Sequence, residues 1–114
     1  MNELRPALLD LHRAIIAFER AARERVSGQL TGGAFLRMLV EDGAYAWLRP
    51  LSALIARMDD EEAAPVTAEE VRTLLRPRST GTPFEQRYAW LMDRSADVAY
   101  AHGMVMRALN AHRR

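Results

Sequence analysis

Three side chains in this sequence could support chemistry through their type and spacing: His12, Ser95 and His102. Ser95 and His102 interrupt an apolar stripe that otherwise recurs at helical spacing in the last third of the chain. If a helix near the N-terminus packs antiparallel to that segment, His12 falls beside His102, and Glu19 falls beside Arg94. A buried polar seam of this kind could hold a metal ion, titrate as a pH switch, or satisfy itself by hydrogen bonds.

Two histidines and one serine are too few ligands for a typical metal site, so we expect neither a metal nor another cofactor. The sequence also lacks cysteine, a Gly-x-Ser-x-Gly turn, a glycine-rich phosphate loop, and the Glu-x-x-His pattern of di-iron helical bundles. No catalytic residue is therefore predicted, and we expect a binding protein more than an enzyme.

A second group of side chains could form an interface between proteins. Tyr100 and Met104 lie opposite the apolar stripe of the last predicted helix, and Trp90 lies to one side of it. Met38 and Tyr45 lie on the outer side of the preceding long helix. Exposed tryptophan, tyrosine and methionine are enriched in interface cores. These five residues predict the contact surface of a homodimer.

The elements that must position these residues are helices, because apolar residues recur at steps of three and four and no strand pattern is sustained. The spacing predicts an all-α antiparallel bundle with three long helices, over residues 3–27, 34–61 and 83–111, and a short helix over 68–76. The chain is expected to form a single domain over residues 1–114. The stripe of the second long helix comprises Leu36, Val40, Gly43, Trp47, Leu51, Leu54 and Met58.

Local signals mark several helix boundaries. Thr67 with Glu70 forms a capping box, and Thr82 with Pro83 and Glu85 gives a clear helix start. Pro50 predicts a kink in the second helix, because it removes one backbone hydrogen bond. Gly43 in the stripe predicts close packing of a neighbouring helix. The alternative is a helix broken there, with Asp42 capping a new one.

The composition excludes several classes of function. The net charge of the 114-residue chain is +1, and all 16 of its basic residues are arginines scattered along helices. Such a chain offers no massed positive field for nucleic acid or for an anionic membrane, so neither is expected as a partner. No stretch approaches the length of a membrane span, and the absence of cysteine favours a reducing compartment. We expect a cytoplasmic protein.

Residues 47–52, with the sequence WLRPLS, together with Leu54 and Ile55 resemble a segment of small uncharacterised all-helical proteins of bacteria. The resemblance covers one helix and implies no function. The sequence therefore predicts an interaction or regulatory module that acts through its apolar helical surfaces as a homodimer, with a further protein partner possible. The alternative is a bundle that binds a small apolar ligand or a metal near His12 and His102.

Overall fold

The computed structural model describes residues 3–111, and all the regular structure in that range is helical. Its elements are α1 (Leu4–Ser27), α2 (Gly32–Glu41), the 3₁₀ helix η1 (Gly43–Leu48), α3 (Arg49–Met58), α4 (Ala68–Leu74), α5 (Pro83–Arg94) and α6 (Ala96–Ala111). None of these helices is both long and apolar enough to cross a membrane. The prediction of an all-α protein is confirmed.

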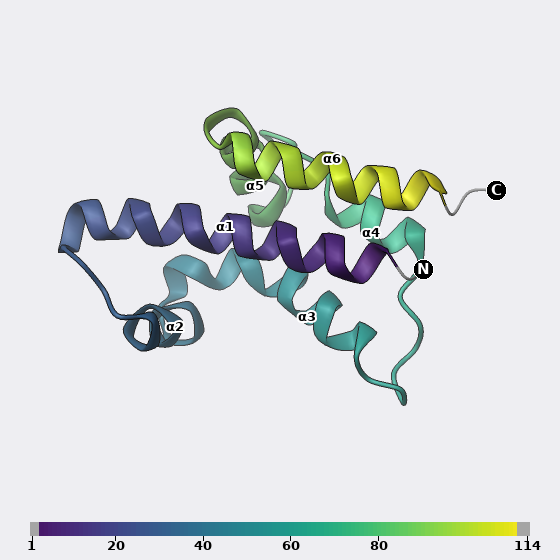
Figure 1. Ribbon diagram of the computed structural model, residues 1–114, viewed down its shortest axis with the longest axis horizontal. Coiled ribbons are helices and arrows are strands. Elements are labelled where there is room, and N and C mark those ends of the chain that lie inside the picture. The colour runs from purple at the N-terminus through teal and green to yellow at the C-terminus, as the bar shows by residue number, and fades with distance from the viewer. Residues whose placement is uncertain (1–2, 112–114) are drawn as a thin grey trace.

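The longest helix, α1, is the centre of the arrangement. It packs against α6, which runs antiparallel to it, and against α3 on its other side (Figure 1). Helix α5 packs on α6 and η1, and α2 contacts mainly η1. Helix α2 therefore lies at the edge of the fold, beyond the start of α3 (Figure 1).

The core forms where the apolar stripes of these helices meet. Nine residues of α1, α5 and α6 have no exposed surface. Those of α1 are Leu4, Leu8, Leu11 and Ile15, and those of α5 and α6 are Tyr88, Leu91, Val98, Val105 and Leu109. All nine lie on the two stripes that the sequence predicts for the first and last helices. The periodicity of those segments thus identifies the surfaces that α1 and α6 bury against each other.

The predicted helix over residues 34–61 is wrong as a single element, because the chain forms α2, η1 and α3 there. Asp42 is extended, with φ −84° and ψ 123°, and its side chain accepts a hydrogen bond from the Ala44 amide at 2.9 Å. Pro50 lies in the first turn of α3, where a missing amide hydrogen costs nothing. The close packing predicted for Gly43 is also wrong, because a Cβ there would meet no atom within 4 Å.

The predicted helix over residues 83–111 is wrong in the same way, because it breaks at Ser95 into α5 and α6. Ser95 is extended, with φ −122° and ψ 112°, and its hydroxyl oxygen accepts a hydrogen bond from the Val98 amide at 3.1 Å. Both breaks have the same cause. A short polar side chain accepts a hydrogen bond from a backbone amide two or three residues later, and this local bond competes with the continuous helix.

The predicted starts of two other helices are confirmed. Thr67 and Glu70 form a complete capping box at α4, and Thr82 and Glu85 form another at α5. The short helix is slightly shorter than the predicted 68–76 and ends at Leu74. The description as three long helices and one short helix is therefore not matched, although α1 agrees closely with the predicted 3–27.

The cap at the start of α6 can be tested directly. Ser95→Ala should lower the free energy of unfolding by about 1 kcal/mol, because the Val98 amide loses its partner, whereas Ser95→Gly should cost only a few tenths. Urea denaturation followed by circular dichroism measures both variants. A Ser95→Ala variant at least as stable as the wild type would show that the Ser95 hydroxyl does not cap α6.

Candidate functional site

A buried ion pair joins the two halves of the chain. Glu19 of α1 is 4% exposed, and both of its carboxylate oxygens accept hydrogen bonds from Arg87 of α5. The two bonds, from Nε and Nη2 of the guanidinium, measure 2.8 and 2.7 Å. An ionised carboxylate is strongly disfavoured in an apolar interior without such a partner. The pairing fixes α5 against the middle of α1. The antiparallel register that we inferred from the sequence places Arg94 beside Glu19, and that pairing is wrong.

Aromatic rings surround this ion pair. The Arg87 guanidinium lies over the ring of Trp90 at 3.9 Å and near the ring of Trp47 at 6.0 Å. Arg94 also lies over Trp90, at 4.4 Å, and the edge of Phe18 packs against the same ring. Trp90 is therefore half-buried, and its ring is already in contact with three side chains. This makes Trp90 a structural residue more than a free interface anchor.

The predicted polar seam does not form one network. His12 Nε2 is hydrogen-bonded to the hydroxyl of Ser52 on α3 at 2.9 Å, whereas His102 Nδ1 is bonded to the hydroxyl of Tyr88 on α5 at 2.6 Å. Ser95 instead caps α6. The three residues make these hydrogen bonds to other groups and none to one another. Among residues 3–111, no group of three or more histidine, aspartate and glutamate side chains is arranged to hold a metal ion.

Tyr88 and His102 form a hydrogen-bonded pair. Tyr88 is fully buried, and burial raises the pKa of its hydroxyl, which therefore keeps its proton; the tautomer of His102 sets which of the two groups donates in the bond to Nδ1. Burial lowers the pKa of His102, and it lowers the pKa of His12 as well. Both imidazoles are thus held in the neutral form. Throughout the described residues, no buried side-chain nitrogen or oxygen lacks a hydrogen-bond partner.

The five residues predicted as an interface lie in different surroundings. Tyr45 is only 8% exposed and packs its ring against the edge of Phe35, so its assignment to an outer surface is wrong. Tyr100 is 73% exposed and, with Met104, lines a groove of about 500 Å³ between α1 and α6. Met38 is half-buried. The structure brings Tyr100 and Met104 together and separates them from Met38 and Tyr45, which lie in and beside α2.

The sequence did not predict that two large apolar residues of α2 are exposed. Leu36 and Val40 lie one turn apart on α2 and are 62% and 66% exposed, although the continuous stripe predicted both for the core. Together with Leu39 and Ile16 they border a groove of about 270 Å³, which His12 and Ser52 also line. We call Leu36, Leu39, Val40 and Ile16 the α2 patch. The signal that could have found it is the Asp42–Gly43 break.

Hydrogen bonds from the rest of the chain hold α2 in this exposed position. The loop before it is tied to α1, because Arg20 donates to the Leu30 carbonyl at 2.6 Å and the Leu30 amide donates to Glu24 at 2.8 Å. At its other end, Arg49 of α3 donates to the Val40 carbonyl at 3.3 Å. The patch is therefore part of an anchored helix.

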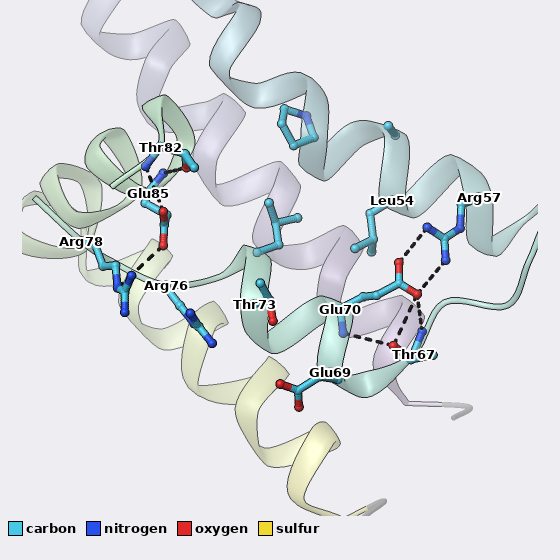
Figure 2. Close-up of a pocket in the computed structure, with 13 residues that line it drawn as sticks. Leu54, Arg57, Thr67, Glu69, Glu70, Thr73, Arg76, Arg78, Thr82 and Glu85 are labelled. Carbon is cyan, nitrogen blue, oxygen red and sulfur yellow. Dashed lines mark hydrogen bonds and ion pairs between the residues drawn. The ribbon is translucent and has the colours of Figure 1, made fainter. Parts of the chain in front are cut away.

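A further cavity, of about 650 Å³, lies between α3, α4 and the start of α5 (Figure 2). We call it the α4 pocket. Pro50, Ala53, Leu54 and Leu74 supply its apolar lining. On one side Arg57 pairs with Glu70 at 2.7 Å, and this contact lowers the pKa of Glu70 to about 2. On the other side Arg78 lies 3.9 Å from Glu85 (Figure 2).

Comparisons with protein-family models, with curated proteins and with solved structures find no match to this chain.

The buried ion pair predicts an asymmetric response to substitution. Arg87→Leu should lower the free energy of unfolding by about 2–4 kcal/mol, because it leaves the Glu19 carboxylate buried without a partner; the value is reduced since Arg87 is itself 34% exposed. The double variant Glu19→Leu with Arg87→Leu should recover most of that loss. Chemical denaturation measures both. A double variant no more stable than Arg87→Leu alone would contradict this account.

The two histidines predict a stability that depends on pH. Because the folded-state pKa of each lies below the unfolded value near 6.5, the unfolded chain binds protons more readily. Their contribution is complete above about pH 6.5 and falls as the pH drops below it. Melting curves between pH 8 and 5 should show this decline. His102→Asn retains a hydrogen-bonding group for Tyr88 and should remove part of this decline in stability.

The matching variant, His12→Gln, retains a hydrogen-bonding group for Ser52 and should remove the remainder. His102→Leu provides the control. It also abolishes titration, but it leaves the buried Tyr88 hydroxyl without a hydrogen-bond partner, so it should cost about 1–3 kcal/mol at pH 8 as well. A wild-type melting temperature that is constant from pH 8 to 5 would show that both imidazoles are free to protonate in the folded state.

Proposed function

We propose that this protein is a self-associating interaction module that works in the cytoplasm as a homodimer, with the α2 patch as its contact surface. The observation that carries the proposal is the exposure of Leu36 and Val40 beside an apolar groove. Two large aliphatic side chains held one turn apart on an anchored helix are a feature of contact surfaces, in contrast to singly scattered apolar residues.

The charges that flank the patch favour a second copy of this chain as the occupant. Arg37 and Glu41 lie one turn apart on the same side of Leu36 and Val40, and neither forms an ion pair within residues 3–111. In an antiparallel pair of α2 helices related by a two-fold axis, the same flank of the two helices lies on the same side of the pair, and the two chains run in opposite directions along it. Arg37 of one copy then lies near Glu41 of the other, twice.

The groove beside the patch supplies the apolar part of the contact. Its lining includes Ile16, Leu39 and Leu48, which are buried or half-buried, and its volume of about 270 Å³ suits aliphatic side chains more than a large ligand. In the two-fold arrangement, Leu36 and Val40 of each copy approach the groove of the other. Each is already about one-third buried, so burying the rest contributes about 1–2 kcal/mol per side chain, for two side chains in each copy.

Leu36→Glu with Val40→Glu should convert the dimer to a monomer, because it places two carboxylates in each copy against the apolar groove. Sedimentation equilibrium measures the mass, and circular dichroism should show unchanged helicity. Val26→Glu is the control, since Val26 is 83% exposed at the C-terminal end of α1, does not line the groove, and should leave the mass unchanged. A wild-type chain that is monomeric at high concentration would overturn the proposal.

Two further variants test which surface and which geometry are used. Tyr100→Glu with Met104→Glu should leave the mass unchanged; if that variant becomes monomeric instead, the groove between α1 and α6 is the interface. Arg37→Glu and Glu41→Arg should each weaken the homodimer, whereas a mixture of the two should form heterodimers. Dimers of equal strength in all combinations would rule out the antiparallel pairing of α2.

A further inference from the structure

The α4 pocket contains three polar side chains that the fold does not use. Thr67, Thr82, Glu70 and Glu85 are engaged in the two capping boxes, and Arg57 and Arg78 approach the two glutamates of those boxes. By contrast, no other side chain or backbone group in residues 3–111 bonds to the side chains of Glu69, Thr73 or Arg76, although all three line the pocket. They are an exposed carboxylate, hydroxyl and guanidinium, and only the charge of Arg76 acts on another pocket residue, since it helps to lower the pKa of Glu85.

These three residues come from one short segment of the chain. Glu69 and Thr73 lie one turn apart on α4, and Arg76 follows Leu75, the residue that caps the end of that helix. Figure 2 shows them around the lower left of the pocket, with Leu54 and the Arg57–Glu70 pair across from them. A ligand in the pocket would therefore meet a negative group, a hydroxyl and a positive group in sequence, beside an apolar wall.

The balance of charge limits what such a pocket would take. Three arginines and three glutamates line it, so the pocket as a whole attracts neither anions nor cations. Two of the arginines are already paired with two of the glutamates. The remaining residues, Glu69 and Arg76, present one negative and one positive group. A molecule that carries both charges satisfies them together, whereas a molecule with a single charge leaves one of them without a partner.

We propose that the α4 pocket binds a small zwitterion with an apolar body, the chemistry shared by apolar amino acids and short peptides with free termini. The ammonium group would pair with Glu69 and the carboxylate with Arg76, while the apolar side chain would contact Leu54 and Leu74. The volume of about 650 Å³ lies within the usual range of ligand pockets, and the site is separate from the α2 patch.

Leucine and the tripeptide Ala-Leu-Ala with free termini are the two probes, titrated into isotope-labelled protein while amide NMR signals are followed. We expect shifts for residues 67–76, with weak affinity in roughly the millimolar range, since the ligand is small and the pocket is open. Response to leucine alone assigns the site to free amino acids, and response to the tripeptide alone assigns it to peptides. The absence of shifts with both probes would overturn the proposal.

Matched ligands and variants test each charge separately. Leucinamide lacks the carboxylate and N-acetylleucine lacks the ammonium group, so each should bind roughly threefold to tenfold more weakly than leucine. Arg76→Gln should weaken leucine by the same factor but leave leucinamide unchanged, and Glu69→Gln should leave N-acetylleucine unchanged. Arg25→Gln, at the end of α1 and outside the pocket, is the control. If the blocked ligands bind as tightly as leucine, the site is only an apolar groove. When the tripeptide is the ligand, its amidated and acetylated forms replace the two leucine derivatives.

Discussion

The Glu19 carboxylate is buried on the side of α1 that faces α5, and the Arg87 guanidinium neutralises it through two hydrogen bonds. A pair of this kind adds little net stability compared with apolar residues of the same size, but it strongly disfavours any arrangement in which one partner is buried alone. It thereby fixes one register of α5 on α1. The same guanidinium lies over the ring of Trp90 and near the ring of Trp47, so the ion pair and the aromatic rings form one cluster.

The position of α2 follows from a second constraint, the break at Asp42. In a continuous helix over residues 34–61, Leu36 and Val40 would continue the stripe that Leu51 and Leu54 bury against the rest of the protein. Because Asp42 bonds to the Ala44 amide and the chain turns there, that stripe is divided. Its second half lies in the core, and its first half, on α2, is exposed. A change of local hydrogen bonding thus converts core residues into surface residues without changing their apolar character.

The sequence predicted the features that depend on near neighbours in the chain. The stripes of α1 and α6 and the capping boxes at Thr67 and Thr82 depend on spacings of three or four residues, and they agree with the structure. The breaks at Asp42 and Ser95 are also local, but there the helical and capped conformations compete closely, and periodicity alone favoured the helix.

The pairings His12–Ser52, Tyr88–His102 and Glu19–Arg87 join residues 40, 14 and 68 positions apart in the chain. Spacing along a helix cannot predict them, because they depend on how whole helices pack. The antiparallel packing of α1 on α6 was inferred correctly, but a register counted along one unbroken helix was not. The break at Ser95 separates α5 from α6, so Arg87 approaches Glu19 on a different helix from the one that carries His102.

Helix α3 forms a wall of both sites. Arg49 and Ser52 line the groove beside the α2 patch, whereas Pro50, Ala53 and Arg57 line the α4 pocket. Successive residues of a helix point in different directions, so ten residues are enough to serve two cavities on different sides. The same helix buries Leu51 and Leu54 in the core, which holds α3 rigidly between the two cavities.

Coupling between two sites requires an element with two arrangements that both sites favour unequally. Buried leucines and the Arg49–Val40 and Arg57–Glu70 bonds hold α3 in place, so we expect the two sites to act independently.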